Sequence, residues 1–354
     1  MKIRFIAIVM LCLLLCGCDS LFDGEYSSVK PHQQQATATD GDTISAANYV
    51  QLYTVLTDLI GDGTEKAVIS VVKYDRNRLQ ADMQRAISDA FARDPITAYA
   101  VGDIKYEMGK SNGQPALAVD ISYTHDRTEI RRIKQVRGME EAVGAISVAL
   151  NQCEVAIVLQ IRGYEDTDFV QVVENYALDN PQNVMEQPLV TVGIYPETGS
   201  NRVVELRFTY QTSRDSLKSM QSEVQPVFDS AALYVSGDGE DREKYSQLYS
   251  FLMERYDYQI EISITPTYSL LRHGVGDSRA FAVVYAAMCR QAGLECQVVS
   301  GTKAGESRYW NIICDDGVYY HVDLLAGRFR EQTDSQMTGY VWDYSAYPAC
   351  GVRS

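Results

Sequence analysis

The sequence predicts an α+β protein with two tandem small α/β repeat modules and a third domain at its C-terminal end. In the first half, helical spacing of apolar residues alternates with short β-branched runs, and the same order returns about 90 residues later. From about residue 228 the pattern changes to one long helix followed by three strand-like segments. A length of 354 residues accommodates two or three domains of ordinary size.

The composition is that of a folded, acidic protein. Apolar residues make up 46% of the chain and charged residues 22%, which excludes wholesale disorder. The 47 acidic residues outnumber the 32 basic residues, and the formal charge is -15. Because surfaces that bind nucleic acid are basic, we expect no nucleic-acid partner and no electrostatic docking on anionic lipid.

The first 17 residues have the features of a secretory signal peptide. Lys2 and Arg4 form a short positive segment, and the apolar run after them is too short to cross a bilayer as a helix. The run ends in Leu-Cys-Gly-Cys at residues 15–18, which resembles the lipobox of bacterial lipoproteins. In that family the peptide is cleaved before the last Cys, whose thiol receives a diacylglyceryl group. The resemblance implies a lipoprotein attached through Cys18 to the extracytoplasmic side of the cell membrane.

Residues 18–42 are expected to form a flexible tether, because they lack hydrophobic periodicity. A lipid attachment of this kind anchors a chain without spanning the bilayer. The alternative is a plain signal peptide that ends beside a chance Cys.

The first module is expected at residues 43–133. Its predicted elements are a helix, a strand, a second helix and a hairpin, at residues 49–60, 67–73, 79–90, 99–108 and 115–123. Asp94-Pro95 ends the second helix, and Ser111-Asn112-Gly113 is typical of a hairpin turn.

The second module, at residues 134–227, has the same predicted order. Its helices are expected at residues 139–151 and 168–178, and its strands at 155–161, 188–195 and 202–210. Matching pairs, such as Asp94-Pro95 with Asn180-Pro181, favour a tandem duplication over a coincidence between two ordinary α+β stretches. His125 and Cys153 stand alone in these modules, so we expect structural roles for them and no metal site.

The third domain is expected at residues 228–354. Its long helix begins at Ser278 and continues through Phe281-Ala282 and Tyr285 to Ala292-Gly293. These residue types and spacings resemble the transglutaminase-like domain of bacterial proteins, which is related in fold to papain-type cysteine proteases. In that family a Cys opens the helix, a His begins a His-Ala-Trp-Asn motif, and an Asp lies in an aromatic-His-Val-Asp-Pro motif.

The resemblance places the three catalytic positions of the family at Ser278, Arg308 and Asp323. The second motif falls on residues 308–311 and the third on residues 320–324, so only the Asp is retained. A Cys thiol at a helix N-terminus beside an imidazole ionises readily. A Ser hydroxyl, in contrast, needs a strong base, and a guanidinium cannot accept a proton. We therefore expect a pseudoenzyme that carries a vestigial triad.

The vestigial site is expected to bind rather than cleave. Arg308 and Asp323 should form an ion pair where the family keeps His and Asp, with Tyr309, Trp310 and Asn311 as neighbours in the cleft. The expected function is that of a binding or scaffold protein at the cell envelope, with an envelope protein, a peptide or a cell-wall polymer as partner and no cofactor. The alternatives are a purely structural spacer and an active hydrolase, peptidase or transamidase that uses Ser278 with an unrecognised base.

Other residues near these motifs are expected to be structural. His273 is the one candidate replacement base in the loop before Ser278, and we expect an ordinary loop histidine. His321 is expected to point to the strand face opposite to that of Asp323. Cys296 and Cys314, on neighbouring strands, are candidates for a disulfide in an oxidising compartment.

Overall fold

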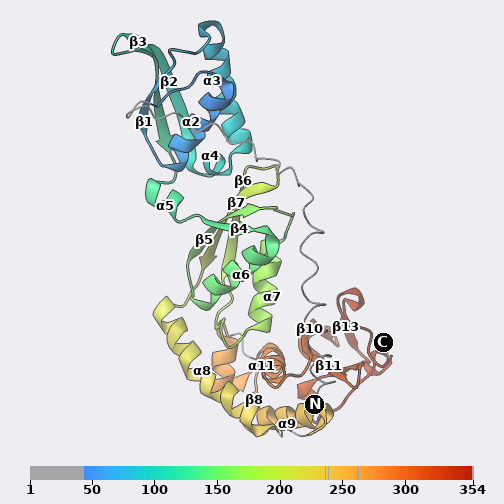
Figure 1. The fold of residues 1–354 in the computed structure, drawn as a ribbon. Helices are drawn as coiled ribbons and strands as arrows, with labels where there is room; N and C mark the ends of the chain where they lie inside the picture. The colour runs from blue at the N-terminus through green and yellow to red at the C-terminus, as the bar shows by residue number, and fades with distance from the viewer. Residues whose placement is uncertain (1–43, 236, 238, 261–262, 353–354) are drawn as a thin grey trace, which may run out of the picture.

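The computed structural model describes residues 44–235, 237, 239–260 and 263–352, which form three units along a curved molecule (Figure 1). The signal peptide expected at residues 1–17, the tether expected at 18–42 and the lipid-bearing Cys18 lie outside the described residues. Within those residues, no helix combines the length and the apolar character that crossing a membrane requires.

The first unit is a three-stranded antiparallel sheet with helices packed on one face (Figure 1). It contains α2 (Tyr49–Gly61), β1 (Lys66–Ser70), α3 (Arg76–Arg93), α4 (Pro95–Ala100), β2 (Val101–Ser111), β3 (Gln114–Tyr123) and α5 (Arg127–Arg131). The strand order is β1-β3-β2, and β3 alternates between buried and exposed residues, as expected for a sheet covered on one side. Leu52, Met83 and Leu117 are fully buried between the helices and the sheet.

The second unit is a four-stranded sheet that meets the first through a small apolar cluster. It contains β4 (Lys134–Arg137), α6 (Gly138–Asn151), β5 (Ala156–Arg162), α7 (Phe169–Asp179), β6 (Leu189–Tyr195) and β7 (Asn201–Thr209). Its strand order is β4-β5-β7-β6. Tyr99 and Ile130 of the first unit pack with Val203 of the second, so the two sheets are joined by buried side chains.

Helices and strands lie close to the predicted positions, with two additions. Pro95 stands in the first turn of α4, a short helix that occupies part of the strand expected at residues 99–108. β4 pairs in parallel with β5 at the edge of the second sheet, and no strand was predicted there. Without β4, the second sheet has the same topology as the first. In each sheet the third strand along the chain lies between the first and the second, as β1-β3-β2 and as β5-β7-β6.

The terminal unit packs a long buried helix between other helices and an antiparallel sheet. Its helices are α8 (Arg214–Tyr234), α9 (Asp241–Met253), α10 (Pro266–Tyr268) and α11 (Ser278–Gln291), with the π-helical turn η1 (Ser269–His273) after α10. Its strands are β8 (Asp257–Tyr258), β9 (Val275–Gly276), β10 (Cys296–Lys303), β11 (Glu306–Asp315), β12 (Val318–Val322) and β13 (Tyr340–Trp342). Short 3-10 helices follow the strands as η2 (Leu324–Ala326), η3 (Asp334–Gln336) and η4 (Tyr344–Ala346).

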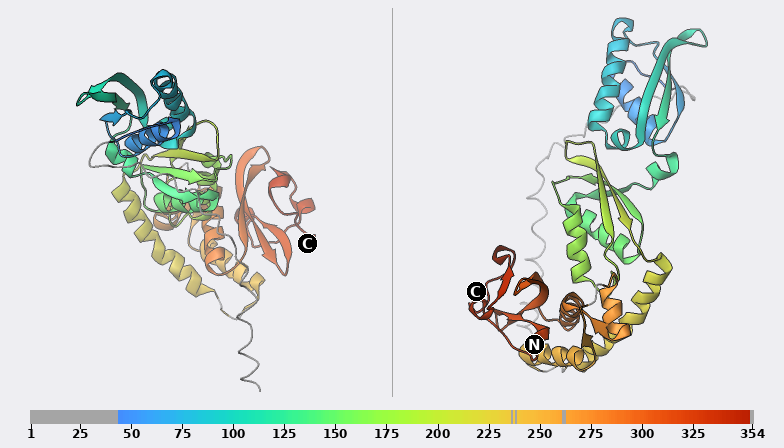
Figure 2. Two further views of the ribbon diagram at one scale, coloured as in Figure 1. Left: turned by 45° about the horizontal axis from the view of Figure 1, so that its top comes forward. Right: turned by 180° about the vertical axis from the view of Figure 1, so that it is seen from behind.

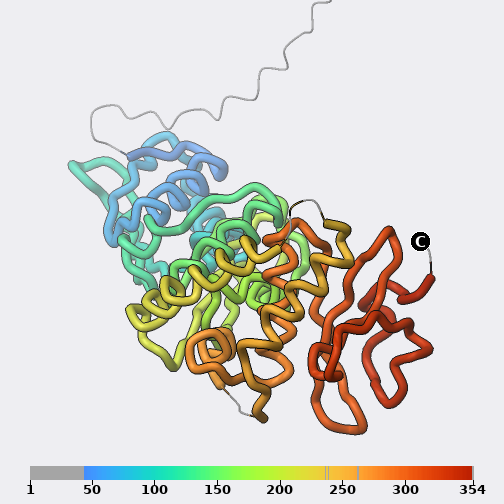
Figure 3. The backbone as a smooth tube through the Cα atoms, turned by 90° about the horizontal axis from the view of Figure 1, so that it is seen from below, coloured from blue at the N-terminus to red at the C-terminus, as the bar shows by residue number. Residues whose placement is uncertain are grey.

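The larger sheet of this unit has the order β12-β11-β10-β13 and lies to one side of the molecule (Figure 2). Seen from below, its strands form a separate layer beside the helices (Figure 3). The domain boundary expected between residues 227 and 228 falls inside α8. Leu217 and Val224, in the first half of that helix, already belong to the same core as α11.

The disulfide considered between Cys296 and Cys314 does not form. Cys296 pairs across the strands with Ile313, so Cys314 points to the other face of the sheet. All five cysteines of the described residues are free thiols. Cys296 instead faces the core beside Cys289 of α11.

We predict that Gly301→Ala weakens the terminal sheet by about 1–3 kcal/mol, because the added carbon overpacks a tight contact. A Cβ atom at Gly301 would overlap the carbonyl oxygen of Val341 and come within 2.8 Å of the Trp310 ring. Chemical unfolding followed by tryptophan fluorescence measures this loss, since both tryptophans of the chain, Trp310 and Trp342, lie in this sheet. Ser300→Ala, at the exposed neighbouring position, should change stability by less than about 0.5 kcal/mol. Equal midpoints for the two variants would contradict the prediction.

Candidate functional site

The position of Ser278 is set by the start of α11. Asp277 caps this helix, and its carboxylate accepts a hydrogen bond from the N–H of Ala280 at 2.9 Å. Ser278 is the first helical residue and is only 8% exposed. Its hydroxyl oxygen accepts a hydrogen bond from the backbone N–H of Tyr309 at 3.2 Å. The expected nucleophile position therefore touches β11 through the strand's backbone.

Arg308 and Asp323 form the ion pair that the sequence predicts. Nη2 of Arg308 lies 2.8 Å from Oδ1 and 2.7 Å from Oδ2 of Asp323, and Nε lies 3.2 Å from Oδ2. The two side chains are 12% and 0% exposed. Such a paired, largely buried guanidinium and carboxylate match each other in both charge and geometry.

Besides Arg308, Asp323 has one more ion-pair partner and two more hydrogen-bond donors. Lys303 Nζ lies 3.6 Å from Oδ2, the hydroxyl of Tyr340 donates to the same oxygen, and the N–H of Leu325 donates to Oδ1 at 3.0 Å. Burial, reinforced by the hydrogen bond to Asp323, raises the pKa of Tyr340 above its ordinary value. The phenol therefore remains a donor at neutral pH, and every side of the carboxylate is occupied.

The expected cleft neighbours divide between two faces of β11. Asn311 faces α11 and donates its side-chain amide to the carbonyl of Ala282 at 2.9 Å. Trp310 faces the other way and donates its indole N–H to Nδ1 of His321 at 2.9 Å. Tyr309 is partly exposed beside Arg279, whose guanidinium carbon lies 6.0 Å from the ring centroid.

The expectation for the orientation of His321 was wrong. Residues two apart on a strand point to the same face, and His321 and Asp323 contact Trp310 and Arg308, which also share a face. The structural role expected for His321 agrees with its contacts, since Nε2 lies 2.9 Å from Oδ1 of Asp334. Burial lowers the pKa of His321, although the Asp334 carboxylate opposes that shift.

One group of potential metal ligands occurs among the described residues, at His321, Asp334 and Cys350. Because Trp310 donates to Nδ1 of His321, Nε2 must carry the ring hydrogen and donate it to Asp334. A metal on Nε2 would therefore require loss of that proton or of the indole bond. Burial raises the pKa of Cys350 to about 12, which keeps its thiol protonated at neutral pH. As the structure shows them, these three residues form a hydrogen-bonded group, in which Asp334 also accepts from the backbone N–H of Cys350 at 3.0 Å.

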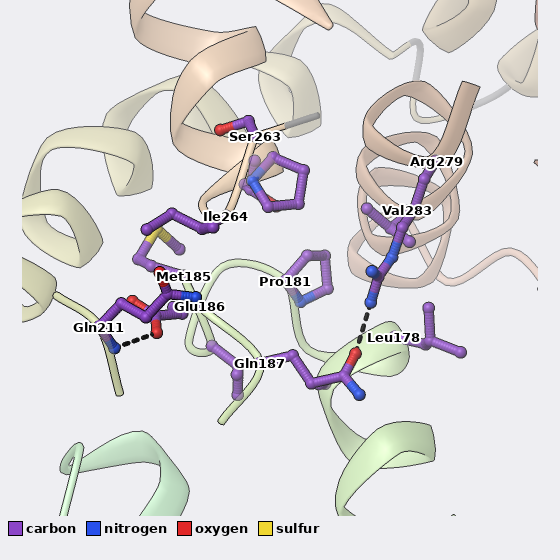
Figure 4. A pocket seen from close by; sticks show the side chains of 14 residues that line it. Leu178, Pro181, Met185, Glu186, Gln187, Gln211, Ser263, Ile264, Arg279 and Val283 are labelled. Carbon is purple, nitrogen blue, oxygen red and sulfur yellow. Dashed lines mark hydrogen bonds between the residues drawn. The ribbon is translucent and has the colours of Figure 1, made fainter. Parts of the chain in front are cut away.

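A pocket of about 290 Å³ lies beside this region, between the second unit and the terminal unit (Figure 4). The end of α7 and the segment after it supply one wall, and Ser263, Ile264 and α11 supply the other. Arg279, the residue after Ser278, reaches into it from α11 and donates to Oε1 of Gln187 at 2.5 Å. The lining of the pocket thus includes Arg279 but not Ser278, Arg308 or Asp323.

The sequence did not single out Arg279, Glu186 or Gln187. Glu186 and Gln187 precede Arg279 by more than ninety positions, and no motif joins the two segments. Only the packing of the second unit on α11 brings them to one pocket. The single local signal was the position of Arg279 directly after the expected nucleophile.

We predict that Arg308→Met destabilises the terminal unit by roughly 3 kcal/mol. Removing one partner of a buried ion pair usually costs about 3–5 kcal/mol of stability, because the other charge stays buried without compensation. Lys303, 3.6 Å from Asp323, still compensates part of that charge, so we expect the lower end of this range. Urea unfolding followed by tryptophan fluorescence measures the change. Arg328→Met removes an exposed arginine and should stay within about 0.5 kcal/mol of the wild type. An Arg308→Met variant as stable as this control would refute a stabilising ion pair.

Comparison with known proteins agrees with the motifs. Residues 229–343 match the sequence profile of the Transglutaminase-like superfamily. A comparison with curated proteins finds no match.

Three solved structures are similar to this chain at low identity. One is a TGase, with 9% identity, a TM-score of 0.27, and coverage of 66% of this chain and 68% of that chain. The second is a candidate cysteine protease from Cytophaga hutchinsonii, with 14% identity, a TM-score of 0.26, and coverage of 44% and 65%. The third is a candidate protease from Parabacteroides distasonis ATCC 8503, with 10% identity, a TM-score of 0.24, and coverage of 72% and 39%.

The match spans less than two thirds of the length of the second and third of these structures. The matched segment of this chain contains α9, α11 and the whole β12-β11-β10-β13 sheet. Residues 229–343 therefore form a transglutaminase-like domain.

Proposed function

We propose that this chain is a lipoprotein, anchored through acylated Cys18 on the extracytoplasmic side of the cell membrane, whose transglutaminase-like domain is catalytically inactive. In this proposal the protein binds or organises a partner at the cell envelope. The observation that carries it is the closed ion pair between Arg308 and Asp323, the two residues at the base and orienting positions that the family resemblance implies. The lipobox-like sequence at residues 15–18 supports the anchor.

The ion pair argues against acyl transfer on chemical grounds. A triad needs a base that accepts the proton of the nucleophile and a carboxylate that orients that base. A guanidinium cannot act as a base, and Asp323 already accepts hydrogen bonds from Arg308, Tyr340 and the N–H of Leu325, with Lys303 3.6 Å away. In a serine protease, removal of the nucleophile or the base alone costs about a millionfold in turnover.

The histidines near the site offer Ser278 no free base. Both ring nitrogens of His321 are engaged, one by Trp310 and one by Asp334. His273 is exposed, and its ring packs edge-to-face against Tyr268 at 5.3 Å. Among the described residues, neither histidine has a hydrogen bond to Ser278. An active hydrolase or transamidase using Ser278 is thus the less favoured alternative.

The first two units are proposed to be a tandem duplication that serves as a spacer or partner-binding arm. Their common strand order, β1-β3-β2 and β5-β7-β6, supports this proposal together with the matching turn sequences. His125 packs flat on Tyr99 at 4.0 Å and contacts its carbonyl oxygen, which is a structural role.

We expect no covalent labelling of Ser278 by a serine-reactive fluorophosphonate or β-lactone probe, because no base activates its hydroxyl. Mass spectrometry of the peptide that contains residue 278 measures the labelling. The double variant Ser278→Cys with Arg308→His restores the residue types of the family and tests whether the scaffold still supports a reactive thiol towards iodoacetamide. Labelling of the wild-type chain at Ser278 that disappears in Ser278→Ala would show an active nucleophile and overturn the proposed inactivity.

We expect Cys18→Ser to move the protein from the membrane fraction to the soluble fraction in a bacterial host. This variant lacks the thiol that the diacylglyceryl group would modify. Incorporation of a clickable fatty acid measures lipidation directly and should fall to background. Cys16→Ser, two residues earlier in the same segment, should keep the label. Unchanged labelling of Cys18→Ser would exclude this anchor.

A further inference from the structure

The pocket between the second unit and α11 carries opposite charges at its two ends. Figure 4 shows Arg279 on one side and Glu186 on the other, with Pro181 between them; Val283 lines the pocket beside Arg279, and Ile264 lines it near Glu186. No ion pair joins the two charges across the pocket. The pocket is therefore lined by a positively charged guanidinium at one end and by a negatively charged carboxylate at the other.

Among the residues that the structure describes, the guanidinium of Arg279 has no carboxylate partner. It donates to the neutral amide of Gln187 and lies over the ring of Tyr309, and no carboxylate oxygen among the described residues lies within 4.0 Å of it. Arg308, on the neighbouring strand, is in contrast paired in a bidentate manner with Asp323. A partly buried arginine without a counter-ion is a suitable partner for a carboxylate ligand.

The carboxylate of Glu186 has no basic partner within the described part of the chain. The residue is only 4% exposed, and its two oxygens accept hydrogen bonds from the backbone N–H groups of Gln211 and Thr212 at 2.5 and 2.9 Å. In the described part of the chain, no Lys, Arg or His nitrogen lies within 4.0 Å of these oxygens. Each oxygen retains a lone pair that can accept a further hydrogen bond.

We propose that this pocket binds a short peptide in zwitterionic form, of about dipeptide size and with an apolar side chain. Its carboxylate pairs with Arg279, and its ammonium group lies toward Glu186. The cavity of about 290 Å³ is at the small end of ligand pockets, which limits the ligand to one or two residues. Leu178, Met185 and Val283 receive the side chain.

The two unpaired charges favour a zwitterion over ligands of one sign. A simple anion would pair with Arg279 and leave Glu186 uncompensated, and a simple cation would do the reverse. A peptide with both termini free neutralises both groups and adds peptide-bond donors and acceptors for the amides of Gln187 and Gln211. This site lies outside the vestigial triad, so the proposal goes beyond the proposed function and does not depend on catalytic inactivity.

Calorimetric titration of the full chain with alanyl-leucine and its blocked forms tests the proposal. We expect the zwitterion to bind, and N-acetylation or C-terminal amidation each to weaken binding by at least about tenfold, because each block removes one charge-assisted contact. Equal affinities for all forms, or no binding of the zwitterion up to about 10 mM, would overturn the proposal. This comparison uses the wild-type chain and needs no variant.

Arg279→Gln then assigns the carboxylate contact. In this variant the free acid and the amide should bind equally weakly, whereas Arg279→Lys should retain part of the preference for the acid. Arg255→Gln is the matched control, because Arg255 lies outside the pocket with its guanidinium over the Phe251 ring. A preference for the acid that survives in Arg279→Gln would place the carboxylate elsewhere and refute the proposed orientation.

Discussion

The burial of α11 on all sides is the constraint on which the terminal half of the molecule depends. Every residue from Ala280 to Cys289 is buried, which is the pattern of a helix enclosed in a core. Tyr285 donates to the carbonyl of Tyr245 in α9 on one side, and Asn311 of β11 donates to the carbonyl of Ala282 on the other. Because its neighbours fix the helix so tightly, its N-terminus presents Ser278 to the sheet and Arg279 to the second unit.

Charge compensation differs between Asp323 and the pocket beside Arg279. The buried carboxylate of Asp323 is enclosed by Arg308, Lys303 and Tyr340, and an enclosed carboxylate of this kind has little capacity left for a ligand. Next to Arg279, a guanidinium and a carboxylate stay apart across an open pocket. Among the described residues, the pocket beside Arg279 therefore offers a ligand more open polar groups than the enclosed carboxylate of Asp323 does. The same helix supports both environments.

Local sequence patterns were sufficient to predict most helices and strands, and the motif spacing was sufficient to predict the ion pair between Arg308 and Asp323. Helical spacing located α2, α3, α6 and α7 within a few residues, and the motif spacing located Ser278, Arg308 and Asp323. No helix was predicted at residues 214–234. Pro226 lies inside α8 on an exposed face, where water can satisfy the carbonyl that its missing N–H leaves free. The parallel edge strand β4 was missed because four residues carry too little periodicity to identify a strand. The orientation of His321 follows from strand alternation, which the prediction had applied wrongly.

The sequence by itself determined the chemistry available at the family's catalytic positions, because residue identity decides whether a group can ionise or accept a proton. It showed a hydroxyl where a thiol was expected and a permanent cation where a base was expected. Only the tertiary structure decided that Cys296 and Cys314 face apart and that Glu186 and Arg279 share one pocket. These relations depend on which faces meet when whole units pack together. A local sequence pattern cannot predict which of these residues meet, because they are far apart along the chain. The burial of other side chains brings them together.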